Sequence, residues 1–245
     1  MRATSIEFRL RMPINMAILI LGLWSPWSGR RTPVLEWLPT QIARAGLFDF
    51  SRAFLVVIVF FALIAALAAV LRVWGSAYLG PGTVINTSMQ AGAVTVDGPY
   101  RYVRNPLYLG LFLMFAAMAV LMPPSGAPVA LVLEAIFIVR LTLGEEAFLA
   151  AQLGDPYRVY LRSVPRFLPR LRTVVPRSST KPNWLLAAAA EITSIGIFIA
   201  LSCFSFSYSS RLIGQVMLVS FGISLIVRAL IKSPSRTSAG NATTV

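Results

Sequence analysis

The sequence predicts an all-α protein, a polytopic integral membrane helical bundle with about six spans. Hydrophobic residues make up 57% of the 245-residue chain, the mean hydropathy is +0.74, and only 13% of the residues are charged. This balance lies outside the usual range of soluble domains. Nineteen consecutive apolar residues run from Ala53 to Leu71. As a helix rising about 1.5 Å per residue, this run can cross the roughly 30 Å hydrocarbon core of a bilayer.

Charge and reactive side chains exclude several classes of protein. The formal net charge is +13, but the charges fall in loops between apolar runs. Membrane orientation and anionic lipid headgroups explain such charges better than nucleic acid does. The chain has no histidine and one cysteine, Cys203. It lacks the commonest metal ligand, any cysteine cluster and any internal disulfide, so we predict no metal site.

The first two predicted helices lie in the N-terminal third. An apolar run, Met12–Trp27, follows Arg2, Arg9 and Arg11, as the hydrophobic region of a signal peptide would. No small-residue cleavage site follows it, so we favour a retained helix that ends in an interfacial aromatic anchor. After a polar stretch rich in proline, the second helix begins at Ala53 and ends near Trp74.

The middle of the chain reads as a helical hairpin between two polar segments. The first polar segment covers 75–105, the apolar limbs cover 107–122 and 129–143, and the second polar segment covers 144–183. Each limb has about sixteen residues or fewer, roughly 24 Å as helix, which predicts a tight pair of short helices. Such a hairpin brings the membrane ends of the two polar segments together.

Two further spans, 184–206 and 212–231, complete the predicted bundle. Of the 22 Lys and Arg residues, 17 fall on the side of the termini and the two polar segments and 5 on the other side. The positive-inside rule therefore places both polar segments in the cytoplasm. The predicted division of the chain is 1–52 for the N-terminal span and loop, 53–172 for the core with the cytoplasmic site, 173–232 for two C-terminal spans, and 233–245 for a disordered tail.

The first polar segment ends in GPYRYVRNPLYLG, residues 98–110. Asn105 is a plausible N-cap and Pro106 suits the first helical position, so the third helix should begin there. The backbone amides of that helix start face the same region as Arg101 and Arg104. Together they predict an anion site at the membrane surface.

The second polar segment opens with adjacent carboxylates. Glu145 and Glu146 fall at the cytoplasmic end of the fourth helix, where acids are costly unless they are paired or bound to a ligand. We expect them to pair with the arginines or with a cationic ligand. Glu134, eleven residues before Glu145, should project from the same helix face. Basic residues that alternate with aromatic and apolar ones predict an amphipathic surface helix downstream: Arg158, Arg162, Arg166, Arg170 and Arg172.

A structural interpretation of the same residues stays open. Juxtamembrane arginines commonly mark the inner membrane face, and Tyr100, Tyr102 and Tyr108 are compatible with an aromatic belt. The adjacent glutamates are compatible with a solvated helix end. An intramembrane acid such as Glu134 is compatible with a helix-to-helix hydrogen bond made while protonated.

These motifs, in this order, resemble the isoprenylcysteine carboxyl methyltransferase and phospholipid methyltransferase superfamily. The resemblance rests on an R-x-P-x-Y segment, a spacer, a Glu-Glu pair and LGDPYRVYLRSVPRFLP, and it covers roughly Val73 to Pro169. It implies an S-adenosylmethionine-dependent membrane methyltransferase that acts on a lipid-linked acceptor. Asn105 departs from the family pattern, which usually has histidine at that position.

The resemblance and the chemistry of S-adenosylmethionine together assign roles to individual residues. A helix start with arginines suits the cofactor carboxylate, glutamate suits its ammonium or ribose diol, and tyrosine faces suit its adenine or sulfonium. The catalytic candidates are Arg104, Tyr108 and Arg166. The cofactor-binding candidates are Tyr100, Arg101, Asn105, Pro106, Leu109, Glu145, Glu146 and Tyr157. Tyr160 and the pair Val164 and Pro165 match the motif that closes the family's site.

The acceptor class follows from proton chemistry. A carboxylate acceptor needs no general base, whereas an ammonium lipid must first lose a proton, and this chain has no histidine to take it. This difference tilts the prediction toward a carboxylate or thiolate acceptor. Tyr108 or Glu145 remains a possible base, and Arg162 or Arg166 could hold an acidic acceptor group.

Two other functions stay open at this stage. One is an NADPH-dependent membrane reductase of the sterol type, which has a similar tyrosine- and arginine-rich helix entry. The other is a non-catalytic scaffold, for which Asn105 is the best support. The expected partners are the lipid bilayer and a lipophilic substrate, without nucleic acid and with the oligomeric state open. The expected location is a bacterial inner membrane or an endomembrane, with the site facing the cytoplasm.

Overall fold

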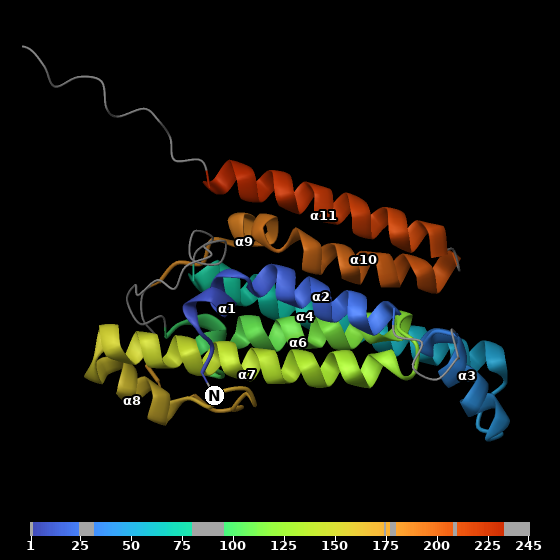
Figure 1. The fold of residues 1–245 in the computed structure, drawn as a ribbon, viewed down its shortest axis with the longest axis horizontal. Coiled ribbons are helices and arrows are strands. Elements are labelled where there is room, and N and C mark those ends of the chain that lie inside the picture. Colours follow the sequence, from blue (N-terminus) through green and yellow to red (C-terminus); the bar gives the residue numbers. More distant parts are fainter. Residues whose placement is uncertain are drawn as a thin grey trace, which may run out of the picture.

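The computed structural model describes residues 2–24, 32–79, 96–173, 175–176, 180–207 and 210–232. These residues form helices without strands, as predicted. The long helices run side by side along the long axis of the molecule, with α3 at one end and α8 at the other (Figure 1). The elements are α1 (Ser5–Arg9), α2 (Arg11–Trp24), α3 (Val34–Arg44), α4 (Phe50–Leu79), η1 (Gly98–Arg101), α6 (Pro106–Met118), η2 (Ala119–Leu121), α7 (Gly126–Leu153), α8 (Asp155–Ser163), α9 (Trp184–Ala190), α10 (Ile192–Ser207) and α11 (Ser210–Lys232).

Helix α4 is the centre of the bundle. It has 30 residues, a few more at each end than the predicted helix. It packs mainly against α6, α10 and α3, and its buried Ile58 lies in a core with Val120 of η2 and Leu201 of α10. The polar stretch after the first span forms α3 despite Pro39, because apolar side chains such as Leu35 pack into the same core. One core therefore joins three of the four predicted parts of the chain.

The hairpin differs from its prediction in one limb. α6 with η2 is short, but α7 has 28 residues and continues to Leu153. The residues after Leu143 are mostly good helix formers, and no proline interrupts them before Pro156. Gly154, with φ +66°, ends the helix. The predicted helix end at Glu145 is therefore wrong, since the glutamate pair lies inside α7, about two turns before its end.

The N-terminal helices pack along α7. Glycines permit the close approach, since a Cβ atom on Gly126 would meet the backbone of Gly22. At the opposite end, the Arg140 guanidinium contacts the Glu7 carboxylate at 2.7 Å, and the Ala3 N–H donates to the Arg140 carbonyl at 3.0 Å. α2 therefore lies antiparallel to α7 along much of its length.

The predicted span 184–206 is broken. α9 and α10 meet at Glu191 with a bend of 71°. The buried Glu191 carboxylate accepts from Arg72 at 2.6 and 3.0 Å and from Ser76 at 2.8 Å, and both donors lie on α4. Because a buried carboxylate must be paired, the chain bends where Glu191 reaches α4.

The six predicted spans are not confirmed. In the described ranges, α4 and α7 are long and apolar enough to cross a bilayer, and the bent α9–α10 pair would make a third span. α2 is apolar but has 14 residues, and α6 has 13. At about 1.5 Å per residue, both are shorter than the roughly 30 Å hydrocarbon core. The predicted tail 233–245 and most of the predicted polar loop 75–105 lie outside the described residues.

Gly126→Ala should destabilise the bundle, because the added methyl group overlaps the backbone of Gly22. Overpacking of this kind typically costs about 1–3 kcal/mol. The measurement is thermal unfolding of the detergent-solubilised protein. Gly222→Ala is the matched control, since a Cβ there meets nothing within 4 Å. Equal melting temperatures for the two variants would contradict the close packing of α2 on α7.

Arg72→Met should destabilise the protein more than the double replacement of Arg72 and Glu191 by methionine. The single change leaves a buried carboxylate without its guanidinium, at a cost of roughly 3–5 kcal/mol. The two side chains are only 14% and 2% exposed. Denaturant unfolding of both variants is the comparison. If the double variant is as unstable as the single one, the unpaired charge of Glu191 is not the cause of the lost stability.

Candidate functional site

The two polar segments that were predicted to share a site lie side by side at the α8 end of the bundle (Figure 1). The N–H of Arg104 donates to the Pro165 carbonyl at 2.9 Å, and the N–H of Arg170 donates to the Tyr102 carbonyl at 3.0 Å. These two bonds hold the chain before α6 against the chain after α8. The predicted juxtaposition of the two polar segments is therefore present in the structure.

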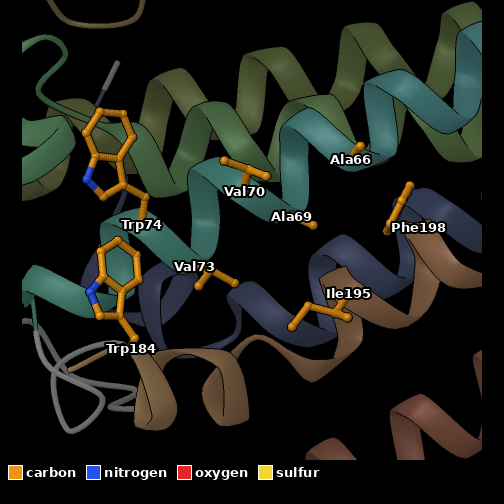
Figure 2. A pocket seen from close by; sticks show the side chains of 8 residues that line it. All are labelled: Ala66, Ala69, Val70, Val73, Trp74, Trp184, Ile195 and Phe198. Carbon is orange, nitrogen blue, oxygen red and sulfur yellow. The ribbon is translucent and has the colours of Figure 1, made fainter. Parts of the chain in front are cut away.

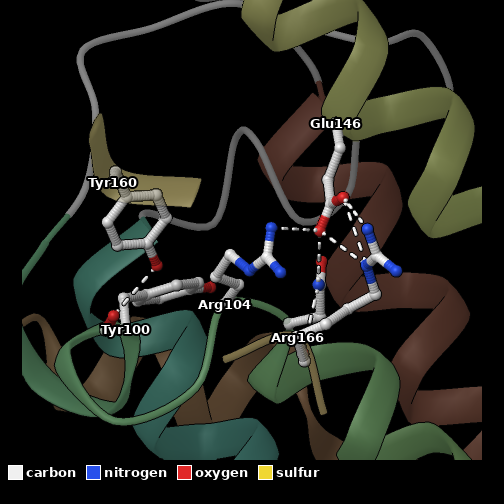
Figure 3. A network of polar contacts seen from close by, with 6 residues as sticks. Tyr100, Arg104, Glu146, Tyr160 and Arg166 are labelled. Atoms are coloured by element: carbon white, nitrogen blue, oxygen red, sulfur yellow. Dashed lines mark hydrogen bonds and ion pairs between the residues drawn. The ribbon is translucent and has the colours of Figure 1, made fainter. Parts of the chain in front are cut away.

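A group of four side chains, which we term the Glu146 cluster, forms the centre of the site (Figure 3). The Glu146 carboxylate, 8% exposed, contacts Arg104 at 3.1 Å and Arg166 at 2.8 Å. Asn105 completes the cluster with a long contact from Nδ2 to Glu146 Oε1 at 3.5 Å. Glu146 raises the pKa of Arg166 further through its hydrogen bonds. The cluster draws together α7, the start of α6 and the chain after α8.

Asn105 acts differently from its prediction. It precedes α6, and Pro106 is the first helical residue, as expected, but the Asn105 side chain makes no capping bond. Its amide instead points to Glu146 and also donates to the Arg166 carbonyl at 3.3 Å. The Glu146 carboxylate and the Arg166 carbonyl lie close enough to bind the Asn105 side chain in place of the backbone amides at the start of α6. Asn105 therefore links the start of α6 to α7 and to the chain after α8.

Glu145 faces a second group of residues. Successive residues on a helix point about 100° apart, so the carboxylates of Glu145 and Glu146 take different hydrogen-bond partners. The Tyr108 hydroxyl of α6 is hydrogen-bonded to Glu145, and Arg11 at the start of α2 is a neighbouring charge. Arg11 was missed as a site residue, because its position before an apolar run indicated only membrane orientation. Only the approach of α2 to α7 reveals it.

Three tyrosines line the side of the cluster formed by η1 and α8. Tyr100, Tyr157 and Tyr160 are each about 7% exposed, and the Tyr160 hydroxyl donates to the Tyr100 carbonyl at 2.9 Å. The rings of Tyr157 and Tyr160 lie 5.8 Å apart. Burial, and then the charge of Glu146, raises the pKa of Tyr157, and burial also raises the pKa of Tyr160. Both phenols therefore stay neutral near neutral pH.

The remaining predicted residues lie around this centre. Arg101 turns away from Glu146, and its guanidinium donates to the Val175 carbonyl at 2.9 Å and to Thr173 at 3.0 Å. Pro106 and Leu109 lie in the first turn of α6, with Pro106 buried. Glu134 is fully buried about eleven residues down α7, and neither of its oxygens has a partner among the described residues. It is not part of the cluster.

The predicted basic amphipathic helix is wrong in its length. α8 ends at Ser163, so Arg158 and Arg162 are helical, whereas Arg166 and the arginines after it are not. Val164 takes an extended conformation before Pro165, as a residue before proline prefers. This early end allows Arg166 to turn back to Glu146.

Comparison with known proteins identifies relatives of the central part of the chain. Residues 53–155 match the family model described as phospholipid methyltransferase. The chain is 37% identical over 78 residues to Protein-S-isoprenylcysteine O-methyltransferase of Schizosaccharomyces pombe, a match that covers 31% of this chain and 33% of that protein. The chain thus spans about a third of the length of this relative. No solved structure matches.

These matches confirm the resemblance stated from the sequence, over the segment that carries the R-x-P-x-Y and Glu-Glu motifs. The matched segment includes most of α4 and all of α7, the two long apolar helices of the described ranges. The protein is therefore an integral membrane protein related to membrane methyltransferases.

Asn105→Asp should destabilise the protein by about 1–3 kcal/mol, because it places a second carboxylate beside Glu146 and removes the donor to the Arg166 carbonyl. Asn105→His keeps a donor and should cost less. Thermal unfolding measures both. Asn183→Asp is the control, since Asn183 caps α9 as an acceptor and aspartate does the same. Equal stability of Asn105→Asp and Asn183→Asp would contradict a donor role for Asn105.

Proposed function

We propose that the protein transfers a methyl group from S-adenosylmethionine to a lipophilic or lipid-linked acceptor, such as an isoprenylcysteine carboxylate or a phospholipid amine. The observation that carries the proposal is the meeting of Arg104, Asn105 and Glu146 at the start of α6, within the segment that matches the phospholipid methyltransferase family. The relative from Schizosaccharomyces pombe supports the same reaction class.

The residues present fit the cofactor. Arg104 Nε and the Tyr100 hydroxyl are buried and have no hydrogen-bond partner in the described part of the chain. Such groups cost free energy unless something binds them. A polar ligand at the start of α6 can accept from Arg104 and from the free backbone amides of the first helical turn. Its amino group can bind a glutamate, and its ring can lie on a buried tyrosine.

S-adenosylmethionine, when bound, supplies a methyl group that is already activated by the sulfonium. The chain's own residues therefore have to bind, orient and exclude water, and no nucleophilic side chain is required. In this proposal Arg104, Asn105, Tyr100, Glu146 and the first turn of α6 hold the cofactor. Arg101 and Tyr157 lie next to these cofactor-binding residues and hold them in place. Leu109 and Pro106 form the apolar side of the cofactor site.

Tyr108 and Glu145 suit the acceptor side of the reaction. They are hydrogen-bonded to each other, Tyr108 from α6 and Glu145 from α7, and Glu145 directly precedes Glu146 of the cluster. An acceptor that must lose a proton can pass it to Glu145, while a carboxylate acceptor needs no such step. Arg166 is 39% exposed beside Glu146 and can hold an acidic acceptor group. The excess of Lys and Arg on this side of the membrane favours a site that faces the cytoplasm.

Glu145→Gln and Glu146→Gln should each weaken S-adenosylmethionine binding or methyl transfer by roughly ten- to hundredfold, because charge-assisted hydrogen bonds contribute about 1.5–3 kcal/mol. The assay incubates purified protein with labelled S-adenosylmethionine and a membrane lipid extract, and calorimetry measures cofactor affinity. Glu36→Gln, an exposed change on α3, is the matched control. Glu146→Gln should affect binding first, and Glu145→Gln should affect transfer first.

The proposal fails if the wild-type protein binds no S-adenosylmethionine and labels no lipid. It also fails if NADPH binds more tightly than S-adenosylmethionine, which would favour a reductase. Unchanged affinity and transfer in both glutamate variants would show that the pair is structural.

A further inference from the structure

An apolar cleft of about 610 Å³ lies between α4 and the bent α9–α10 pair (Figure 2). This volume falls in the range of small-molecule binding sites, roughly 300–1,000 Å³. Every side chain that lines the cleft is apolar. Its walls include Ala66, Val70 and Trp74 of α4, Trp184 of α9, and Ile195 and Phe198 of α10.

The bend at Glu191 creates this cleft. A straight helix from Trp184 onward would carry α9 along the axis of α10, whereas the 71° bend turns α9 across the end of the cleft. Figure 2 shows Trp184 below Trp74 at the same end. The pairing of Glu191 with Arg72 fixes the bend, and Arg72 also donates to the Leu107 carbonyl in the first turn of α6 at 3.1 Å. One guanidinium thus positions both the cleft wall and the start of the site helix.

The Trp74 end of the cleft adjoins the candidate site. The Trp74 ring lies 6.0 Å from the ring of Tyr102, between Arg101 and Arg104 in the sequence. The next residue, Gly75, packs so closely on α6 that an added Cβ would meet Leu107. The cleft therefore leads to the chain segment that carries Arg104, without containing a charged group itself.

The apolar rim of the cleft is exposed at the surface of the bundle. Val70 is 63% exposed and Trp184 is 51% exposed, and both lie on its rim. From Ala66 to Trp74 the cleft follows α4 for about 12 Å, at about 1.5 Å per residue. Since α4 is long enough to span a bilayer, an exposed apolar rim on this helix is suited to contact with hydrocarbon, and a chain can enter sideways.

We propose that this cleft binds the hydrocarbon chain of the methyl acceptor and delivers the acceptor's polar end to the Glu146 cluster. The inference rests on the proposed function and adds the part of the protein that selects a lipid-linked acceptor. The apolar lining provides no partner for a headgroup, so the polar end must lie beyond Trp74, on the side of Arg104. The α9–α10 wall lies outside the matched segment 53–155, so the family match does not assign this site.

Filling the cleft should impair lipid methylation without affecting the cofactor. Ala66→Phe and Ile195→Phe each add a ring inside the cleft from opposite walls. The amount of lipid extract required for half-maximal transfer should rise roughly 15- to 60-fold, because that is the effect of excluding two or three methylenes from an apolar site. S-adenosylmethionine affinity should stay within about twofold of wild type. Leu67→Phe, a lipid-facing change next to Ala66 and outside the cleft, is the matched control.

Chain binding can be measured without turnover. A full-length variant with Trp24, Trp27 and Trp37 replaced by phenylalanine retains Trp74 and Trp184 as its tryptophans. A brominated long-chain fatty acid, added at low mole fraction in detergent micelles, should quench their fluorescence saturably. Ala66→Phe in this background should abolish the saturable part, and Leu67→Phe should retain it.

The outcomes separate the two proposals. A wild-type protein that labels no lipid but shows saturable quenching contradicts the methyltransferase proposal and leaves a chain-binding site. The cleft assignment is overturned if lipid labelling and quenching are the same in Ala66→Phe, Ile195→Phe and Leu67→Phe. The methyltransferase proposal then still stands. Quenching that rises linearly with fatty acid also overturns it, because surrounding lipid rather than a site would then be the quencher.

Discussion

The pairing of one buried carboxylate, that of Glu146, determines how the two polar segments meet. A carboxylate shielded from water is strongly unfavourable unless cations and donors surround it. Its partners come from the start of α6 and from the chain beyond α8, so the cluster connects parts of the sequence that are 20 to 42 residues away. Arg166 can reach Glu146 only because α8 ends at Ser163. The arrangement of the chain at the α8 end of the bundle therefore depends on pairing the charge of Glu146.

The buried carboxylate of Glu191 must likewise be paired with a cation. Its pairing with Arg72 bends the chain between α9 and α10, and Arg72 reaches on to the Leu107 carbonyl. The start of α6 is thus held by an arginine of α4 on one side and by the Glu146 cluster on the other. Because both networks use buried charges, small displacements at this helix start are costly. A rigid start of α6 is what the proposed cofactor site requires, since binding there would depend on fixed amide and guanidinium positions.

The long α7 adds a second geometric constraint. It continues past the start of α6, so both glutamates remain in a regular helix that separates their directions by about 100°. Glu146 faces Arg104, while Glu145 faces Tyr108. A fraying helix end would not keep two adjacent acids apart in this way. In the proposed function, this arrangement assigns one acid to the cofactor and the other to the acceptor, and the apolar cleft beside Trp74 leads to the same end of the bundle.

The sequence by itself determined the helical membrane class, the start of α6 at Pro106 and the family resemblance, and it singled out the four residues that meet in the Glu146 cluster. Apolar run length, proline position and motif spacing are local properties, and local properties can be read directly. The tertiary structure alone decided which glutamate pairs with which arginine, that Asn105 bridges rather than caps, and that Arg11 approaches Glu145. It also decided the bend at Glu191. These outcomes depend on contacts between residues far apart in the chain, where a buried charge selects the partner that packing brings within reach.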